Sequence, residues 1–515
     1  MGYKVSVRGL ELVEAARKLK GWKCQDPRWY QAACVDVSTL KRFRSSEIIS
    51  EVTFSKICEA VGITDWQKVA APSNSNLVSR QDWGNAPSLE MALYGRSNEL
   101  ETLTNWIISD KCRLVSVRGL TGIGKTTLIR HLAEVLKDQF EFVIWRSLYP
   151  ETSSLQELID DLVNFFLKNE KTEIYSLKNL IDCFQKHRCL VVLDDIQTIL
   201  ETKKLSGKYQ QQFKDYQSLF ERTSQPHQSC LIVIGNEQPT TISILKERNN
   251  WVQLLTLSEL SKEASFNLLK TLNLNNLDGY DLLVKNYCGN PFFIKFISKK
   301  IKNLSGGNIS KYLNLETNLI GGISEWLDNQ FNRISFKEEQ VLYWLAVFRC
   351  PISFQVLLEK MKWIGTNEEI FNCLESLISR SLIDEIKDSD GGILYSLNSV
   401  LLKYVSMRFV DEIVSEIVNL VNTQSIDNTS ILCTHSLFIT SEEVDTDEAR
   451  QHYVLNPIKQ KLVNCYSVDD AVVTQLSIVL IKYKTCQTES EYIVENIYGL
   501  INMFDHLHSR TYEVI

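Results

Sequence analysis

A glycine-rich turn between an apolar strand and an amphipathic helix constrains this 515-residue chain more than any other feature. The strand is LVSV (114–117), the helix is LIRHLAEVLK (128–137), and the turn fits the pattern GxxxxGK[ST]. Glycines at this spacing let the backbone curl so that its N–H groups point inward, and the following helix N-terminus favours an anion. The sequence therefore predicts a loop that binds nucleotide phosphates through Gly119, Gly122, Gly124, Lys125, Thr126 and Thr127.

Side chains of this loop and of a later strand predict a site for a nucleotide with Mg²⁺. Lys125 is expected to bridge the outer phosphates, and Thr126 to ligate the ion. The strand CLVVL (189–193) ends in Asp194 and Asp195. We expect Asp194 to hold Mg²⁺ through water and Asp195 to polarise an attacking water, as the catalytic residue. A strand that ends in two aspartates is by itself commonly just followed by a turn. We assign these two to Mg²⁺ and water because they follow the phosphate loop in the chain.

Apolar strands alternate with amphipathic helices through the middle of the chain. They are LVSV (114–117), FVIW (142–145), CLVVL (189–193), CLIVI (230–234) and VQLLTL (252–257). This alternation predicts an α/β fold with a doubly wound parallel sheet. After about residue 260 helices dominate. They are followed by SLIDEI (381–386), the turn DSDGG and ILYSL (393–397), and helices followed by such a two-stranded wing predict a winged helix.

Composition excludes several classes of protein. The 13 cysteines include no CxxC spacing, and this odd, scattered set predicts reduced thiols rather than a disulfide framework or a zinc site. No apolar run reaches the roughly 18–20 residues that span a bilayer, and no signal peptide is recognisable. We therefore expect a cytoplasmic protein without membrane contact. The net charge of −7 argues against wholesale coating of nucleic acid.

Changes of pattern divide the chain into segments. The N-terminal residues have apolar side chains at helical spacing, Asp26-Pro27 supplies a helix cap with a first-turn proline, and Ser38 is expected to begin the next helix. Residues 71–93 lose this periodicity and gain Ser, Asn, Pro and Gly. The predicted segments are a helical, helix-turn-helix-like domain (1–70), a linker (71–93), a nucleotide-binding domain (94–260), a helical domain (261–328), a winged helix (329–410) and a helical C-terminal segment (411–515).

Several motifs occur in a recognisable order. They are Tyr94-Gly95-Arg96 with Glu99-Leu100, the phosphate loop, FEFVIWRSL (140–148), LVVLDD (190–195) and Gly289-Asn290-Pro291-Phe292. In this order they resemble the NB-ARC domain of STAND-class signalling ATPases, which are P-loop NTPases. The likeness is strongest to cyanobacterial members with a helical N-terminal domain, and covers residues 1–410 well and 410–510 loosely.

The resemblance implies roles for residues outside the phosphate loop. Tyr94, Gly95 and Arg96 border the adenine, Pro291 closes the base and sugar pocket, the helical domain is of the ARC type, and the winged helix packs on the nucleotide. Asn236 stands where the family usually has an arginine that senses the γ-phosphate, and Asn398 stands where relatives use His or Gln to contact ADP. An amide carries no positive charge. We therefore expect slow hydrolysis and weak retention of ADP, with nucleotide binding intact.

The function implied is an ATP/ADP-binding molecular switch in signal transduction. ADP holds the winged helix closed, ATP releases it for self-association, and slow ATP hydrolysis resets it. An effector or sensor protein is an expected partner, because relatives continue into WD or pentapeptide repeats; the sensor is expected to be absent, supplied by another chain or lost by truncation. Two alternatives stay open. One is a turnover ATPase, and the other is a transcription regulator whose residues 1–70 bind DNA through Lys41, Arg42 and Arg44.

Overall fold

The computed structural model describes residues 2–505, except residues 25, 48, 72–78, 90, 91, 168–173, 315–321, 389, 424–429, 439–446, 467, 468 and 485–490. Its internal contacts divide the chain into two compact units, one of residues 1–80 with 137–141, and one of residues 81–136 with 142–515. Each has its own hydrophobic core. Within the described ranges, none of the helices combines the length and the apolar character that a bilayer crossing requires.

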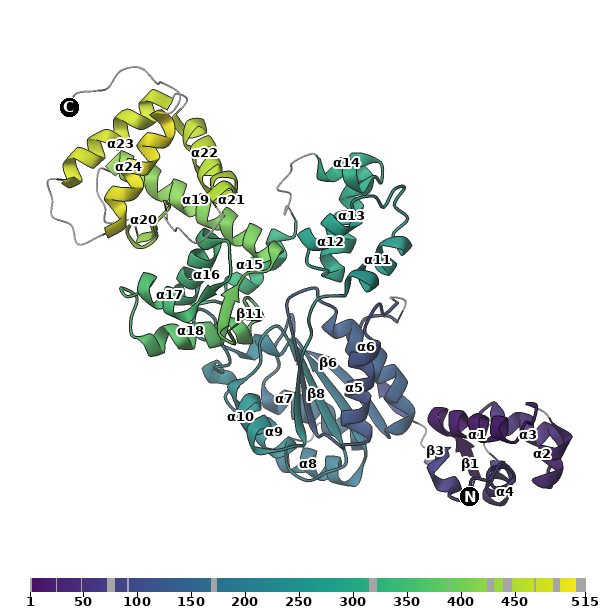
Figure 1. Ribbon diagram of the computed structural model, residues 1–515. Coiled ribbons are helices and arrows are strands. Elements are labelled where there is room, and N and C mark those ends of the chain that lie inside the picture. Colours follow the sequence, from purple (N-terminus) through teal and green to yellow (C-terminus); the bar gives the residue numbers. More distant parts are fainter. Residues whose placement is uncertain are drawn as a thin grey trace. The chain divides into compact units, whose positions relative to one another are not determined.

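The N-terminal unit combines short helices with a small antiparallel sheet (Figure 1). The central strand β1 (Gly2–Val5) pairs with β2 (Ile49–Ser50) and with β3 (Ala70–Ala71), and these strands are absent from the prediction of helices alone. The α-helices are α1 (Val7–Leu19), α2 (Pro27–Ala32), α3 (Val37–Arg44) and α4 (Glu51–Ala60).

Side-chain caps set the starts of these helices. Asp26 accepts a hydrogen bond from Arg28 N at 3.0 Å, and Pro27 is the first residue of α2, as the sequence predicts. Helix α3 instead begins after Asp36, whose carboxylate accepts from Thr39 N at 2.7 Å. The helix therefore begins at Val37, one residue before Ser38, because the nearby Asp36 supplies the cap.

The second unit is built on a six-stranded sheet with the order β4-β6-β7-β8-β5-β9. Strands β5 to β9 pair in parallel and lie where the apolar runs predict them. Strand β4 was not predicted; it forms one edge of the sheet from within the expected linker 71–93, of which residues 72–78, 90 and 91 lie outside the description. The bounds are β4 (Arg80–Asp82), β5 (Leu114–Arg118), β6 (Phe142–Ser147), β7 (Cys189–Asp194), β8 (Cys230–Gly235) and β9 (Val252–Thr256).

Helices cover both faces of this sheet, so the fold is the doubly wound α/β arrangement that the sequence predicts. Every residue of β7 and β8 is buried, which explains their unbroken apolar runs. One face packs against α7 (Leu155–Leu167), α8 (Leu177–Lys186), α9 (Tyr216–Thr223) and α10 (Thr240–Arg248). The opposite face carries α5 (Ser97–Ile108) and α6 (Lys125–Leu136) (Figure 1).

Helical segments follow the sheet. The first group is α11 (Lys262–Thr271), α12 (Tyr280–Asn286), α13 (Pro291–Ser305) and α14 (Ile309–Leu313). The next is α15 (Ser324–Phe331), α16 (Phe336–Phe348), α17 (Phe354–Lys360) and α18 (Asn367–Ser379), with an antiparallel sheet of order β10-β12-β11. Its strands are β10 (Ile352–Ser353), β11 (Asp384–Lys387) and β12 (Ile393–Ser396); of the turn DSDGG between the last two, Ser389 lies outside the description.

A long helix, α19 (Ser399–Thr423), joins this part to the C-terminal helices. It runs through residue 410, where the sequence predicts a boundary, and one continuous hydrophobic core extends from the α11 helix to the last helix. The predicted division at 410/411 is therefore not a break in the packing. The remaining helices are α20 (Ser430–Thr434), α21 (Asp447–Arg450), the π-helical segment η5 (Gln451–Leu455), α22 (Asn456–Tyr466), α23 (Asp469–Lys484) and α24 (Glu491–Asp505).

Candidate nucleotide site

The phosphate loop lies between β5 and α6, and its backbone curls at its glycines. Gly119, Gly122 and Gly124 have φ angles of 156°, 75° and 102°, which L side chains rarely adopt. A Cβ atom on Gly122 would lie 2.7 Å from the Cβ of Phe292 and 3.1 Å from Oδ1 of Asn290. The position requires glycine because the start of α13 packs directly against the loop.

Lys125 is held inside the loop by three oxygen atoms. Its Nζ donates to the carbonyl oxygens of Gly119 at 2.9 Å and Leu120 at 3.1 Å, and to Oδ1 of Asn236 at 2.7 Å. Burial lowers the pKa of Lys125 to about 8, and two nearby aspartates oppose that shift. A phosphate group would offer this ammonium a charged acceptor, which makes a stronger hydrogen bond than a carbonyl or an amide oxygen.

Asp194, the last residue of β7, is buried close to Lys125 and Thr126. Burial, and after it the charge of Asp195, raise the pKa of Asp194 to about 7, while hydrogen bonds that include one from the Thr126 side chain lower it. A carboxylate and a hydroxyl are oxygen ligands of the kind Mg²⁺ takes, and a cation would offset this buried negative charge. Thr126 and Asp194 therefore fit as ligands of the predicted Mg²⁺. The bound ion would neutralise part of the phosphate charge. Among the described residues no group of three or more His, Cys, Asp or Glu is placed to hold a metal.

Asp195 is oriented by neighbouring side chains. Its Oδ2 accepts from Ser147 Oγ and its Oδ1 from Gln197 Nε2, both at 3.0 Å. Its backbone is left-handed, with φ of 60°, and its N–H donates to Oδ1 of Asp194 at 2.9 Å. The two carboxylates predicted from the sequence are thus adjacent at the end of β7, and the carboxylate of Asp195 is fixed by two donors.

A cavity of about 250 Å³ opens beside the phosphate loop and brings together residues that are far apart in the sequence. Predicted site residues that line it are Tyr94, Arg96, Gly122, Gly124, Thr126, Thr127 and Pro291. The sequence did not predict the other lining residues: Ile123 and Phe292 lie within recognised motifs but were given no role, and the rest, Ala92, Leu93, Leu260, Leu268 and Lys295, are single apolar or basic residues outside any motif.

Arg96 and Gly95 act in the packing around this cavity. The buried guanidinium of Arg96 donates to the carbonyl oxygens of Ile123 at 3.2 Å and Ser258 at 2.6 Å, and pairs with Glu99 at 2.7 Å. It therefore ties the phosphate loop to the segment after β9. Gly95 is not among the lining residues; a Cβ there would lie 2.2 Å from that of Ala264.

Pro291 is the first residue of α13, and the start of this helix is bound to the phosphate loop. Asn290 caps the helix and donates through Nδ2 to the carbonyl oxygen of Thr121 at 3.0 Å. Phe292 N donates to the carbonyl oxygen of Gly122 at 3.3 Å. The ring of Pro291 is thereby placed on one wall of the cavity.

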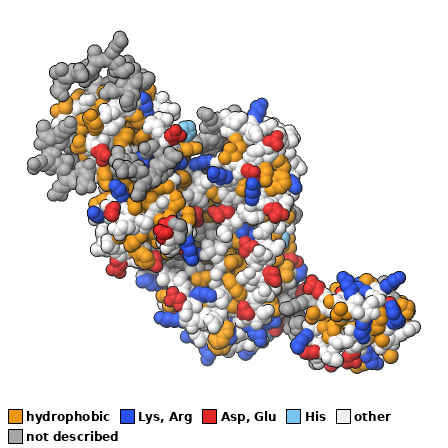
Figure 2. All heavy atoms as spheres, viewed as in Figure 1, with side chains coloured by type: hydrophobic (Ala, Val, Ile, Leu, Met, Phe, Trp, Pro, Cys, Tyr) orange, Lys and Arg blue, Asp and Glu red, His pale blue; other side chains and the backbone are white. Residues whose placement is uncertain are grey.

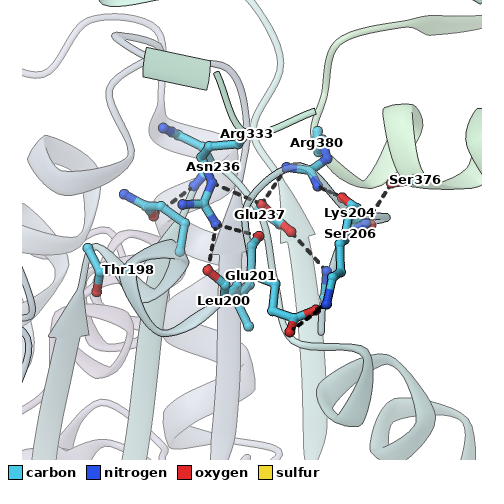
Figure 3. Close-up of polar contacts among 12 residues, drawn as sticks. Thr198, Leu200, Glu201, Lys204, Ser206, Asn236, Glu237, Arg333, Ser376 and Arg380 are labelled. Atoms are coloured by element: carbon cyan, nitrogen blue, oxygen red, sulfur yellow. Dashed lines mark hydrogen bonds and ion pairs between the residues drawn. The ribbon is translucent and has the colours of Figure 1, made fainter. Parts of the chain in front are cut away.

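Asn236, just after β8, contacts the phosphate loop, and Glu237 next to it connects the sheet to the later helices. Figure 3 shows Arg333 and Arg380 pointing toward Glu237. Arg380 Nη1 lies 2.7 Å and Arg333 Nε 3.3 Å from Oε2 of Glu237. Arg380 Nε also contacts Glu338 at 3.2 Å, and the side chains of Glu237, Glu338 and Arg380 are at most 3% exposed. The sequence gives no sign of this buried ionic cluster.

Further hydrogen bonds tie the same cluster to the chain between β7 and α9. Arg380 Nη2 donates to the carbonyl oxygen of Lys204 at 2.7 Å, and Gly207 N donates to Oε1 of Glu237 at 2.9 Å. Ser376 Oγ accepts from Ser206 N at 2.7 Å (Figure 3). The same hydroxyl donates to Glu338 at 2.6 Å. The contacts of α18 with the sheet thus begin one residue from Asn236.

Asn398 is not brought to the cavity. Its Oδ1 accepts from Leu401 N at 3.0 Å, so its side chain caps the first turn of α19. The residue is absent from the lining of the cavity beside the phosphate loop. In this arrangement Asn398 has a structural role that its place after the wing did not suggest.

The basic cluster on α3 is largely paired with acidic side chains. Arg42 contacts Glu47 at 3.1 Å, and Arg44 contacts Glu14 at 2.8 Å. On the face seen in Figure 2, basic and acidic side chains of this unit are interspersed. The unit therefore lacks, on that face, the continuous basic surface that phosphate backbones favour.

Comparison with known proteins identifies the region that carries the site. Residues 96–265 match the family described as "NB-ARC domain". An uncharacterized WD repeat-containing protein of Nostoc sp. is 28% identical over 465 residues, or 80% of this chain, and a disease resistance-like protein of Arabidopsis thaliana is 25% identical over 276 residues, or 51% of this chain. The chain spans only 36% and 22% of the lengths of these relatives.

Among solved structures, a STAND protein with a tetratricopeptide repeat sensor from Pyrococcus horikoshii aligns with this chain. The alignment covers 82% of this chain and 60% of the Pyrococcus chain. Its sequence is 15% identical and the TM-score is 0.32, a likeness too low to support any assignment. The assignment stands on the family match and on the site itself, in which residues of the phosphate loop and Pro291 line one cavity. Residues 96–265 of this chain are an NB-ARC domain, a nucleotide-binding signalling domain on a phosphate-loop α/β fold.

Proposed function

We propose that the chain is an ATP/ADP switch of the STAND class, closed with ADP and self-associating with ATP. The observation that supports this most is the ionic cluster of Glu237, Arg333, Glu338 and Arg380, which begins beside Asn236 and joins the sheet to α16 and α18. A nucleotide that moves Asn236 would disturb a buried charge network at once. Breaking such a network is costly, so the closed state is a discrete one.

The residues have separate roles in this proposal. Lys125 and the loop glycines bind the β- and γ-phosphates, Thr126 and Asp194 hold Mg²⁺, and Asp195 orients a water for slow hydrolysis. Tyr94, Arg96 and Pro291 bound the base and sugar. Bound Mg²⁺ supplies positive charge to the phosphates.

The domain limits belong to the same proposal. Residues 94–260 form the nucleotide-binding part, 261–328 an ARC-type helical part and 329–410 the winged helix, for which the order of α16, β10, α17, α18, β11 and β12 is the support. Residues 1–70 form an adaptor for an effector or sensor protein in the cytoplasm. Because Arg42 and Arg44 are paired with acids, we do not extend the proposal to DNA binding.

Native mass measurement of the full chain tests the switch. We expect one nucleotide per chain, a monomer with ADP and a larger assembly with a non-hydrolysable ATP analogue. A chain that binds both nucleotides but keeps one mass would contradict the switch, and a chain that binds neither would contradict nucleotide recognition itself.

A further inference from the structure

A second cavity of about 250 Å³ lies between α19 and the segment that contains η5 and α22, away from the phosphate loop. In Figure 1 these helices are in the green to yellow part of the chain. Apolar carbon atoms of Met407, Val410 and Pro457 form much of its wall, and polar groups come from Lys403, Ser406, Tyr453 and Lys461. A small apolar cavity with a few convergent polar groups is the common form of a ligand site.

Lys403 lines this cavity, and Arg349 does not line it but contacts the lining residues Ser406 and Tyr453; within the described part of the chain neither cation has an acidic partner. Lys403 makes no ion pair among the described residues, and its Nζ lies 5.7 Å from the ring centre of Tyr287. Arg349 donates to Ser406 Oγ at 3.0 Å and lies 4.4 Å from the ring centre of Tyr453, also without an ion pair in the described part of the chain. Both side chains are partly buried.

Some other cations of the same unit do have acidic partners. Arg380 pairs with Glu237 and Glu338, and Lys461, at the rim of the cavity, pairs with Asp411 at 2.6 Å. Burial lowers the pKa of both Lys403 and Arg349, and for Lys403 the positive charge of Arg349 lowers it further. Partly buried charges are normally paired, so two neighbouring cations without acids favour an anion from outside the chain.

The backbone beside the cavity has a form often found at functional sites. Residues Gln451–Leu455 make a π-helical turn between α21 and α22. Such insertions are rare and recur at functional sites, where they place a side chain that a regular helix would direct elsewhere. Here the turn carries Tyr453, which lines the cavity and stacks with Arg349.

We propose that this cavity binds a small organic anion with an apolar body, its acidic group held by Lys403 and attracted also by the neighbouring charge of Arg349, and its body against Met407, Val410 and Tyr453. Carboxylates, sulfonates and phosphate monoesters share this chemistry. The site is distinct from the nucleotide cavity, which has none of these lining residues.

Lys403 also connects the proposed site to the nucleotide cavity. It faces Tyr287, and the turn after Tyr287 leads through Gly289 and Asn290 to Pro291, which lines the nucleotide cavity. An anion that draws Lys403 away from Tyr287 should change the rate of ADP release, an expectation that rests on the proposed switch. Ligand binding and this coupling are separate measurements.

The test of binding uses the full chain and two fluorescent probes, anilinonaphthalene sulfonate and the uncharged N-phenylnaphthylamine. We expect Lys403→Met to weaken sulfonate binding about tenfold, because a hydrogen-bonded charge is lost, and to leave the uncharged probe unaffected. Lys403→Arg, which keeps the charge, should retain the affinity. Lys299→Met, which removes an exposed lysine of α13, is the matched control and should bind both probes like the parent chain.

The proposal is wrong if the parent chain does not bind the sulfonate, or if Lys403→Met and Lys299→Met bind it equally. Circular dichroism checks that each variant folds, and Lys403→Gln replaces Lys403→Met if the latter does not. A chain that binds the sulfonate through Lys403 while its ADP release is unchanged keeps the site and loses only the coupling. Absence of nucleotide binding would count against the proposed switch and leave the probe result standing.

Discussion

The ammonium group of Lys125 lies 2.7 Å from the amide oxygen of Asn236. An arginine at position 236 would place a second cation against this buried lysine, whereas asparagine offers an acceptor. Asn236 therefore stabilises the charged form of Lys125 when no phosphate is present, and it leaves the site without the additional cation that the family resemblance implies. Binding and hydrolysis should depend differently on these two residues.

Replacing Lys125 by alanine should abolish nucleotide binding. No other side chain of the loop carries a positive charge that can lie between the β- and γ-phosphates. Calorimetric titration with ADP and ATP measures this, and circular dichroism shows whether the variant is folded. Unchanged affinity in a folded variant would contradict the phosphate-loop assignment.

ATP hydrolysis should be slow, below about one turnover per second. A cation that stabilises the transition state of phosphoryl transfer contributes roughly 10³–10⁵ in rate, and Asn236 cannot supply it. Phosphate release under saturating ATP gives the rate, with Lys125→Ala as the control for contaminating activity. Faster turnover would favour the working ATPase over the switch.

Glu237→Gln should loosen the closed arrangement. Removing one partner of a buried ion pair costs about 3–5 kcal/mol. Here the change leaves the positive charges of Arg333 and Arg380 without the carboxylate that offsets them. Faster ADP release and easier proteolysis between the sheet and α16 are the expected readouts. Asp281→Asn makes the same chemical change in the exposed pair with Lys262 and should leave both unchanged; equal behaviour of the two variants would exclude the cluster as the closing contact.

Asn398→Ala should lower stability by about 1 kcal/mol, the usual cost of losing a helix cap, and Asn398→Ser should restore it. Thermal melting of the three proteins measures this. The ADP release rate separates the cap from the contact with ADP that the resemblance implies. If Asn398→Ser melts like the parent chain but releases ADP faster, the side chain also reaches the nucleotide in the closed state.

His435 should make the chain less stable in mild acid. Burial lowers its pKa to about 3, while the unfolded chain titrates near the ordinary value of 6.5. The unfolded state therefore binds more protons below 6.5, so this contribution to stability is complete above pH 6.5 and falls as the pH drops toward 3. The loss at pH 5 relative to pH 7 is about 2 kcal/mol.

Urea denaturation at pH 7 and pH 5 checks this dependence. Between pH 7 and pH 5 the free energy of unfolding of the His435→Gln variant should change by about 2 kcal/mol less than that of the parent chain. This holds even if the variant is less stable at both pH values. The exposed His452 provides the control, since His452→Gln should keep the pH dependence of the parent chain. An equal pH dependence in all three proteins would place the titration elsewhere.

Local chemistry was enough to predict much of the second unit. The strands of the parallel sheet, the loop with Lys125 and the aspartates at the end of β7 were predicted because buried parallel strands are unbroken apolar runs and because phosphate binding needs glycines in one short segment. Asp26 and Pro27 likewise predicted the start of α2. In each case the signal and the structure lie within about ten residues.

Tertiary structure alone decided which distant residues meet. Glu237 and Arg380 are separated by 143 positions, and each is by itself an ordinary charged residue of a loop or helix end. Strand β4, the cap by Asn398 and the position of Lys403, which has no ion pair among the residues described, are of the same kind, since none is marked by a periodic pattern. Periodicity reports which face of one element is buried, but the pairing of polar groups depends on which elements pack together. That choice is made by burial over the whole unit, because a buried charge is costly unless the packing also brings groups that offset it.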